Sequence, residues 1–461
     1  MSNTTQRKPN IVFIMADNLG WGELGCYGGG SLRGAPTPRI DELAEDSLRL
    51  TNYNVESDCV PTRAALMTGR QAIRTGAFQS LPPGVPQGLT RWEILLPELL
   101  KKTGYATAHF GKWHLGDIQE RMPSARGFDE WYGLPRTLNE AFFTTTVGYD
   151  PEVVPKPYLM EGKAGEESVN LGEFNLETRR LIDAEVVERS VKFMRKNVEA
   201  GTPFFLYAPT TQMHFPNLAH PDFVGKTGFG EMADSLAELD HRVGQLIDEV
   251  DALGIRDNTV FVMSSDNGPE FRDPWRGTAG FWRGTYHTAM EGGLRAPFII
   301  RWPGYISAGV VSDEIVHVSD MYTTLATIGG ACDHIPTDRP VDGKDMTKFF
   351  CGESKSPREG LVYYIKQDMR AVKWRDWKLH YYWEPEVNQS KGKLESPMLF
   401  HLVQDPKEET NIAMGNNWAL GPIHKLVAEF NQSLKDFPPI PPGTLDPYTP
   451  PWSEGNLRPI N

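Results

Sequence analysis

Short apolar runs alternate with amphipathic segments over the first part of the chain. The runs have the length and composition of buried strands, and they occupy residues 10–16, 106–110, 204–208, 260–264 and 298–301. The amphipathic segments carry apolar side chains three or four positions apart, as core-facing helices do, at residues 39–48, 181–187 and 232–247. This alternation predicts an α/β fold with a large, mostly parallel sheet flanked by helices.

The pattern changes near residue 340. Short aromatic and apolar runs separated by turn residues predict a smaller antiparallel sheet at residues 363–365, 370–374 and 377–382. An amphipathic segment at 423–434 predicts a helix after this sheet, and prolines are frequent beyond residue 438. We therefore expect two domains: an N-terminal α/β domain at residues 1–340, and a smaller C-terminal α+β domain with a proline-rich tail at residues 341–461.

Composition limits the partners that the chain can have. With 461 residues, 39% of them hydrophobic and 23% charged, it resembles ordinary globular proteins. The formal net charge of -13 argues against nucleic acid as a partner, because a phosphate backbone requires a basic surface. An anionic substrate would have to be bound by a metal ion or by a local cluster of basic side chains.

Cysteine usage and hydropathy bear on the cellular compartment. The four cysteines form no Cys-x-x-Cys pair, so neither a disulfide framework nor a structural zinc site is indicated. The apolar run at 11–16 is too short for the core of a signal peptide, and no stretch approaches the roughly 18 apolar residues of a membrane span. We expect a cytoplasmic protein with no membrane partner. The sequence does not indicate an oligomeric state.

Two predicted strands end in an Asp-Asn pair. Asp17-Asn18 and Asp266-Asn267 each follow directly on an apolar run. Residues directly after the strands of such a sheet lie where ligands bind, and carboxylate and amide oxygens suit hard cations. Asp-Asn pairs also build turns and helix caps, so a purely structural role is the alternative. We predict that the four side chains hold Ca²⁺ or Mg²⁺.

The motif with the most chemical content lies at residues 59–70, which read Cys-Val-Pro-Thr-Arg-Ala-Ala-Leu-Met-Thr-Gly-Arg. This stretch resembles the signature of the type I sulfatases of the alkaline phosphatase superfamily, the bacterial arylsulfatases among them. The resemblance implies that a maturation enzyme oxidises Cys59 to formylglycine, the aldehyde nucleophile of sulfate-ester hydrolysis, which also contacts the metal. A lone cysteine is more often a buried apolar thiol, which is the alternative for Cys59.

Arg63 follows Cys59 by one turn of the predicted helix. A guanidinium at this place, together with the positive end of the helix dipole, can hold the oxygens of a sulfate group. A divalent cation beside an aldehyde hydrate would make the hydroxyl of the hydrate more acidic, as it does for metal-bound water.

Two further motifs resemble elements of the same family. Residues 111–116 read Gly-Lys-Trp-His-Leu-Gly, and the resemblance implies that Lys112 binds sulfate and that His114 assists the aldehyde hydrate. Their spacing of two would place both side chains on one side of an extended segment. His214, in Gln-Met-His-Phe-Pro, matches the acid that protonates the leaving group. A solvated basic turn and a hydrogen-bonded surface histidine are the structural alternatives.

The resemblance extends to residues 291–297 and 399–411 and so covers nearly the whole chain, but two positions depart from it. Asn18 stands where the family usually has a second aspartate, so we expect weaker or differently selective metal binding. Tyr286 stands where the family has a sulfate-binding lysine. We expect the adjacent His287 to replace that cation. The alternatives are Arg283, Lys373, and a loop histidine without this role.

These observations predict an arylsulfatase-like enzyme that converts a sulfate monoester to an alcohol and sulfate. The alternatives are hydrolysis of phosphonate or phosphate esters on the same scaffold, and a non-catalytic anion-binding protein in which Cys59 stays a thiol. The sequence does not name the alcohol, whose pocket we expect at residues 137–176 and at the tail after residue 438. Aromatic side chains there indicate an apolar leaving group or ordinary packing: Phe142, Phe143, Tyr149 and Tyr158.

Overall fold

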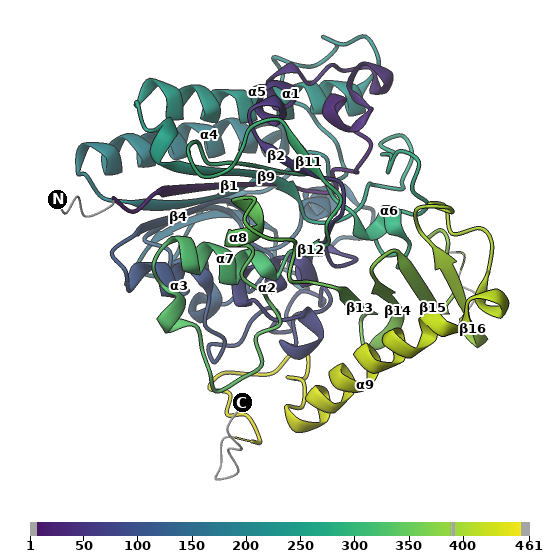
Figure 1. The fold of residues 1–461 in the computed structure, drawn as a ribbon. Coiled ribbons are helices and arrows are strands. Elements are labelled where there is room, and N and C mark those ends of the chain that lie inside the picture. Colours follow the sequence, from purple (N-terminus) through teal and green to yellow (C-terminus); the bar gives the residue numbers. More distant parts are fainter. Residues whose placement is uncertain (1–6, 388, 390–391, 453–461) are drawn as a thin grey trace, which may run out of the picture.

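A ten-stranded sheet forms the frame of the computed structural model, which describes residues 7–387, 389 and 392–452 (Figure 1). Its strands lie side by side in the order β11-β2-β10-β9-β1-β8-β4-β5-β6-β7. Their bounds are β1 Asn10–Ala16, β2 Leu48–Leu50, β4 Ala106–Lys112, β5 Glu130–Leu134, β6 Tyr158–Lys163, β7 Val169–Glu173, β8 Phe204–Pro209, β9 Thr259–Ser265, β10 Phe298–Arg301 and β11 Val310–Ser312.

The centre of this sheet is parallel. The strands β9, β1, β8, β4 and β5 run in one direction, and Ala16 at the end of β1 lies opposite Ser265 at the end of β9. The predicted large, mostly parallel sheet is therefore confirmed, with antiparallel strands at its two margins. One margin begins at β10, which runs antiparallel to β9, and the other at β6, which runs antiparallel to β5.

Helices cover both faces of the sheet (Figure 1). One face carries α1 (Pro38–Glu45), α4 (Leu176–Glu199) and α5 (Glu231–Ala252). The other face carries α2 (Cys59–Thr68), α3 (Leu96–Lys101), α7 (Asp320–Ile328) and α8 (Thr347–Phe350). The helix predicted at 39–48 begins and ends earlier, because Leu48 already belongs to β2.

Successive side chains of β1 enter two separate hydrophobic cores. Ile11, Phe13 and Met15 belong to the core that includes residues of α2, α3 and α7. Val12, Ile14 and Ala16 belong to the core that includes residues of α1, α4 and α5. This alternation follows from the two-residue period of a strand and explains why every residue from Ile11 to Ala16 is apolar. Within the described ranges, no helix has the length and apolar character that a membrane span requires.

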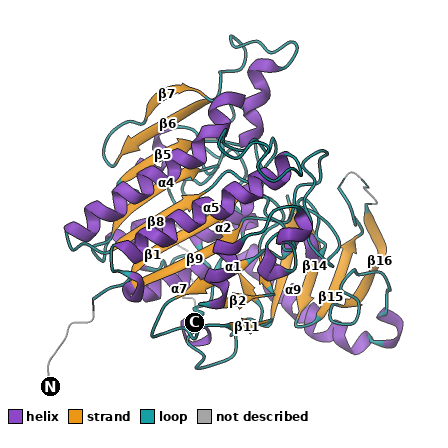
Figure 2. Cartoon of the chain, turned by 90° about the horizontal axis from the view of Figure 1, so that it is seen from above, coloured by secondary structure: helices purple, strands orange, loops and turns teal. Residues whose placement is uncertain are grey.

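A second, antiparallel sheet lies beside the carboxyl ends of the parallel strands (Figures 1 and 2). Its strands are β13 (Gly360–Ile365), β14 (Asp368–Trp374), β15 (Trp377–Tyr382) and β16 (Lys393–His401), in that order. The helix α9 (Leu420–Asp436) packs on β13 and β14. The predicted small sheet and its helix are confirmed. The boundary near residue 340 stays a prediction.

A group of buried charges joins the small sheet to the short helix α6 (Glu291–Leu294), which precedes β10. We call it the junction cluster, and it consists of Glu291, Lys373, Lys378, His380 and Glu408. Lys373 Nζ donates to Glu291 Oε2 at 2.7 Å, and Lys378 Nζ donates to Glu291 Oε1 at 2.8 Å. The backbone N–H of Glu291 donates to Glu408 Oε1, and His380 Nε2 lies within hydrogen-bond distance of Glu408 Oε2. Each carboxylate oxygen of the cluster therefore has a partner.

Candidate active site

The two Asp-Asn pairs meet at the carboxyl edge of the sheet. Because β1 and β9 are parallel neighbours in register, Asp17-Asn18 and Asp266-Asn267 leave the sheet side by side. The backbone N–H of Asn18 donates to Asp266 Oδ1 at 3.1 Å, and Asn267 Nδ2 donates to Asn18 Oδ1 at 2.7 Å. All four side chains are buried. The structure thus brings together four residues that lie in two pairs about 250 positions apart.

Two fixed cations lie against these carboxylates. Arg63, on α2, donates from Nη2 to Asp266 Oδ2 at 2.8 Å and to Asp17 Oδ2 at 3.2 Å. Lys112, the last residue of β4, donates from Nζ to Asp17 Oδ2 at 2.7 Å. Burial alone would raise the pKa of Asp17, but Lys112, His214 and Arg63 together hold that pKa below its ordinary value. Burial, followed by the charge of Asp17, raises the pKa of Asp266 to about 6.

Two oxygens at this edge lack hydrogen-bond partners. Asp17 Oδ1 and Asn267 Oδ1 are buried, and neither has a hydrogen-bond partner among the described residues. A buried acceptor without a partner is costly, so such atoms point to an absent ligand. No group of three or more His, Cys, Asp or Glu side chains in the described ranges could hold a metal, because amides supply half of the donors here. Carboxylate and amide oxygens together fit a hard divalent cation.

Glu270 was missed by the sequence reasoning. Its side chain is fully buried, and its Oε2 accepts a hydrogen bond from Asn18 Nδ2 at 3.2 Å. This bond orients the Asn18 amide and puts a negative charge close to the position where the family has an aspartate. The only signal in the sequence is an acid three residues after Asn267, which is too common a pattern to predict a role.

Cys59 is the first residue of α2. Asp58 caps the helix by accepting the Cys59 backbone N–H at 2.7 Å, and its Oδ1 also lies 3.3 Å from Cys59 Sγ. Burial, and then the charge of Asp58, raises the pKa of the thiol well above its ordinary value. The thiolate is the reactive form of cysteine, so the unmodified side chain is a poor nucleophile at this place.

His114 faces Cys59. Its Nδ1 lies 3.2 Å from Cys59 Sγ, and its Nε2 lies 3.3 Å from Ser80 Oγ. The prediction that Lys112 and His114 lie on one side of an extended segment is wrong. β4 ends at Lys112, and His114 has a left-handed backbone with φ of 60°. Its backbone N–H donates to Pro135 O at 3.0 Å and stabilises this conformation. Burial, and then Lys112, lowers the pKa of His114 well below 6.5, so the imidazole is neutral.

His214 lies in the loop that follows the end of β8. Its Nδ1 is 2.6 Å from Phe215 O, and its Nε2 is 3.5 Å from Thr137 Oγ1. Burial lowers the pKa of His214 to about 3, although the charge of Asp17 acts in the opposite direction. The carbonyl partner fixes the proton of the neutral ring on Nδ1, so Nε2 is the nitrogen that can exchange a proton with a ligand.

The residues proposed to replace the family lysine lie in three different places. His287 Nδ1 lies 3.8 Å from Asp58 Oδ2, and its side chain is 40% exposed, which puts it at an open side of the Cys59 environment. Lys373 belongs to the junction cluster and also donates to Asn52 and Asn54. Arg283 Nη2 donates to Glu409 Oε1 at 3.0 Å. Of the three, His287 is the one that contacts neighbours of Cys59: its ring faces Asp58, and its backbone N–H donates to Ser57 O at 2.6 Å.

Arg272 is a further cation that the sequence reasoning missed. Its Nη1 donates to Glu270 Oε1 at 3.0 Å and to the hydroxyl of Tyr286, and its guanidinium carbon lies 4.0 Å from the centroid of the Phe215 ring. Each of these partners adjoins a predicted site residue. Glu270 accepts a hydrogen bond from Asn18, Tyr286 precedes His287 in the sequence, and Phe215 follows His214. Arg272 therefore links the carboxyl edge of the sheet to the loops of the two histidines. Its contacts depend on loop paths, for which the sequence carries no signal.

Comparisons with known proteins show the family to which the chain belongs. The sulfatase family model matches residues 9–331, and the model of the C-terminal region of aryl-sulfatase matches residues 356–454. Arylsulfatase A of Homo sapiens is 34% identical, with 93% of this chain and 87% of that protein covered. N-acetylgalactosamine-6-sulfatase of Rattus norvegicus is 32% identical, with 94% and 87% covered.

A solved structure extends the comparison to three dimensions. The PsFucS1 sulfatase from Pseudoalteromonas sp. matches with a TM-score of 0.89 and 32% identity, and the match covers 94% of this chain and 92% of that one. Sequence and fold thus agree with those of known sulfatases over almost the entire chain. The chain belongs to the type I sulfatase family and is an enzyme of the sulfuric ester hydrolase class.

Proposed function

We propose that this sulfatase hydrolyses sulfate monoesters to an alcohol and sulfate through formylglycine made from Cys59, with Ca²⁺ or Mg²⁺ as cofactor. One observation carries the proposal: Cys59 adjoins His114 at a buried edge that has two fixed cations and two partnerless oxygens. An inert thiol at this place supports a role for a modified Cys59, because the unmodified side chain has no evident chemical use.

The residues at the carboxyl edge fit the cofactor. Asp17, Asn18, Asp266 and Asn267 would hold the cation, and Ca²⁺ is favoured because it accepts mixed carboxylate and amide ligands in flexible geometry. When present, the aldehyde hydrate supplies a hydroxyl nucleophile, and the cation draws charge from the sulfate oxygens. Asn18 stands where the family has an aspartate, and Glu270, which is hydrogen-bonded to Asn18, would supply the missing negative charge.

Four basic side chains would bind the sulfate group. Arg63 and Lys112 are buried and already oriented by carboxylates, so they require little rearrangement when charge develops in the transition state. Arg272 and His287 lie on the more exposed side, where a substrate enters. A set of cations on both sides of residue 59 would neutralise an oxyanion that the negatively charged protein as a whole repels.

The two histidines divide the proton transfers. Neutral His114 has Nδ1 directed at residue 59, where it accepts the proton of a hydroxyl group. His214 would protonate the departing alcohol from Nε2. A bound sulfate ester brings negative charge next to the ring and raises the pKa of His214, so protonation of this nitrogen depends on substrate.

The test is a mass measurement combined with turnover. The chain is expressed with a formylglycine-generating enzyme, and the peptide that contains residue 59 is weighed. We expect a loss of about 18 Da relative to cysteine and hydrolysis of 4-nitrophenyl sulfate in proportion to the modified fraction. An active protein with an intact thiol would contradict the proposed nucleophile. Faster hydrolysis of 4-nitrophenyl phosphate than of the sulfate would favour the phosphate-ester alternative.

Two predictions concern the cell rather than the site. We propose the formylglycine-generating enzyme as a partner, since Cys59 cannot be converted without an oxidising activity. The cytoplasmic location stays a prediction, and fractionation of the source cells with an antibody against the chain would test it.

A further inference from the structure

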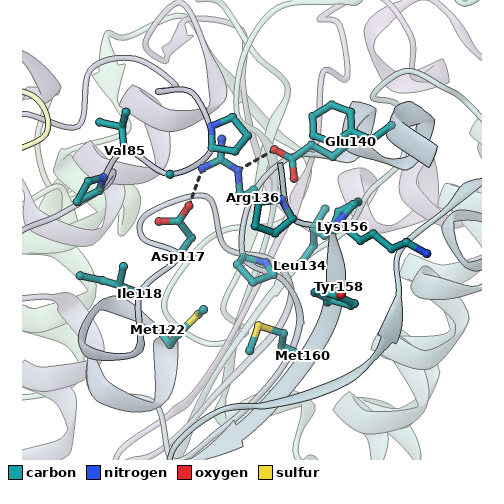
Figure 3. A pocket seen from close by; sticks show the side chains of 17 residues that line it. Val85, Asp117, Ile118, Met122, Leu134, Arg136, Glu140, Lys156, Tyr158 and Met160 are labelled. Carbon is teal, nitrogen blue, oxygen red and sulfur yellow. Dashed lines mark hydrogen bonds and ion pairs between the residues drawn. The ribbon is translucent and has the colours of Figure 1, made fainter. Parts of the chain in front are cut away.

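A cavity of about 310 Å³ opens beside the candidate active site (Figure 3). Its walls come from the loop at residues 83–86, the segment 117–122, the end of β5, the short helix Leu138–Thr145 and the strand β6. The volume falls at the lower end of the range for small-molecule sites. Seven of the cavity's 17 lining residues belong to the stretch 137–176, where the sequence predicted the alcohol pocket, and none belongs to the tail after residue 438, which the same prediction included.

Three consecutive residues connect this cavity to both histidines. The carbonyl of Pro135 accepts the backbone N–H of His114 at 3.0 Å, and Thr137 Oγ1 lies 3.5 Å from His214 Nε2. Between them, Arg136 lines the cavity. A group that leaves from the sulfate near His214 therefore has this cavity as an adjacent space.

The polar wall of the cavity is a guanidinium held by two carboxylates. Arg136 donates from Nη1 to Asp117 Oδ2 at 2.6 Å and from Nε to Glu140 Oε1 at 2.7 Å, as Figure 3 shows. Its Nη2 donates to Leu81 O at 2.7 Å. In the described part of the chain, no hydrogen bond involves the second oxygens, Asp117 Oδ1 and Glu140 Oε2. These oxygens can accept hydrogen bonds from hydroxyl groups of a ligand.

The charge of this wall disfavours a second anionic group on the ligand. Arg136 is one cation against the two carboxylates of Asp117 and Glu140. The other cation at the cavity, Lys156, donates to Glu173 Oε2 at 2.8 Å, and its side chain extends away from Arg136 in Figure 3. The wall that Arg136 forms with Asp117 and Glu140 is thus negative, and a second sulfate or a carboxylate placed against this wall would meet repulsion.

The remaining walls are apolar and aromatic. Met122, Leu134 and Met160 line the side opposite Glu140, and Phe143 and Tyr158 add aromatic rings. A sugar ring matches both walls, because it has apolar C–H faces and a rim of hydroxyl donors. A simple aryl group would cover the apolar walls but leave the carboxylate oxygens without partners, which costs free energy.

We propose that this cavity binds the leaving alcohol as an uncharged sugar ring, so that the preferred substrates are neutral saccharides with one sulfate group. The inference rests on the proposed sulfatase function and specifies its substrate class. Asp117, Arg136 and Glu140 are then specificity-determining residues, and the sulfate group itself lies outside the cavity, against Lys112 and Arg63.

The experiment compares matured enzyme on three substrates: a neutral hexose monosulfate, the same hexose with a second sulfate, and 4-nitrophenyl sulfate. We expect kcat/KM to be highest for the hexose monosulfate and to fall about tenfold or more with the second sulfate. Asp117→Asn should lower the ratio of kcat/KM for hexose monosulfate to that for 4-nitrophenyl sulfate about tenfold. Glu188→Gln, an exposed acid on α4, is the matched control and should leave this ratio unchanged.

Inhibition by the free hexose gives a second readout that does not depend on turnover of the sugar ester. The hexose should compete with 4-nitrophenyl sulfate, and Asp117→Asn should weaken this inhibition about tenfold. An enzyme that hydrolyses 4-nitrophenyl sulfate but is indifferent to a second sulfate on the hexose would overturn the sugar assignment. So would an Asp117→Asn variant that slows both substrates equally. Failure on every sulfate ester would instead refute the proposed function.

Discussion

The candidate active site and the junction cluster are both built from fully buried charges, but they differ in completeness. In the junction cluster, each oxygen of Glu291 and Glu408 accepts a hydrogen bond or ion pair from the protein. At the carboxyl edge of the large sheet, Asp17 Oδ1 and Asn267 Oδ1 have no hydrogen-bond partner within the described ranges. Buried carboxylates thus have protein partners for all of their oxygens in the junction cluster, whereas acceptor oxygens at the carboxyl edge are left available to a ligand.

This difference has a thermodynamic consequence. Charges that are mutually satisfied contribute to folding without any ligand, and breaking one pair is costly because the other charge stays buried. Buried acceptor oxygens without partners lower the stability of the free protein, which recovers only when a ligand binds. Substitutions in the two regions should therefore be separable by whether they change turnover, ligand-dependent stability or intrinsic stability.

The largest expected effect comes from removing the proposed nucleophile. Cys59→Ala breaks the site and leaves the junction cluster intact, so turnover of 4-nitrophenyl sulfate should fall by more than about 10⁴-fold. The free energy of unfolding should change by only about 1 kcal/mol. Steady-state kinetics and urea unfolding of the same preparation measure both. Sulfatase activity that survives this substitution would falsify the mechanism.

The second effect concerns the junction cluster. Glu291→Gln removes the shared counter-charge of Lys373 and Lys378 and should lower the free energy of unfolding by about 3 to 5 kcal/mol. Glu409→Gln is the matched control, because Glu409 forms an exposed pair with Arg283 and should matter by less than about 1 kcal/mol. Equal effects in urea unfolding would show that the junction charges are not coupled to stability.

The same cluster predicts a pH dependence. Burial would raise the pKa of Glu291, but Lys373, Lys378 and Arg295 outweigh it and hold the pKa well below the ordinary 4.5. Its stabilising contribution is therefore present above pH 4.5 and is lost as the pH falls through the folded-state pKa. Glu291→Gln should flatten the acid limb of the stability profile. An unchanged acid limb in thermal unfolding between pH 3 and 6 would contradict this assignment.

A smaller effect is expected from the cation itself. Ca²⁺ at a hundredfold excess over its Kd should raise the free energy of unfolding of chelator-treated protein by about 2.7 kcal/mol. Glu270→Gln weakens the support of Asn18 and should reduce Ca²⁺ affinity about tenfold. Titration calorimetry measures this affinity without substrate. Glu188→Gln is again the control, and an unchanged affinity of the Glu270→Gln variant would remove Glu270 from the site.

The smallest effect concerns the exposed cation. Arg272→Ala should raise the KM for sulfate esters about tenfold, as expected for the loss of one charge-assisted hydrogen bond. Inhibition by free sulfate should weaken by a similar factor. Arg283→Ala removes a nearby arginine that pairs with Glu409 and should leave both quantities unchanged. A matching rise in KM for the two variants would indicate a general electrostatic effect in place of a contact.

Four of the five central parallel strands could be predicted from the sequence because both of their faces are buried, whereas β5 was missed. Each residue of β1 is apolar or buried, so the run 10–16 is visible without knowledge of its neighbours. β6 and β7 were not predicted because they lie at a margin of the sheet, where exposed and half-buried residues alternate irregularly. β16 was not predicted for the same reason, because most of its residues are exposed or half-buried.

In the candidate active site, too, some contacts could be predicted from the sequence and others could not. The meeting of Asp17 with Asp266 could be expected, because both follow strands of one parallel sheet. The contacts of Arg272 and Glu270 arise from the path of a loop after β9, which no periodicity encodes. The left-handed backbone of His114 likewise depends on Pro135, a residue of another strand end.

The burial of Cys59 also sets a time limit on its own oxidation. In the folded chain its side chain is 5% exposed, and Arg63 on the same helix is tied to Asp266, which the ribosome adds about 200 residues later. Synthesis at about 5–20 residues per second takes on the order of 10 to 40 s over this stretch. On the proposed mechanism, the maturation enzyme must reach Cys59 before β9 joins β1. The speed of translation between α2 and β9 would then determine what fraction of the molecules becomes active.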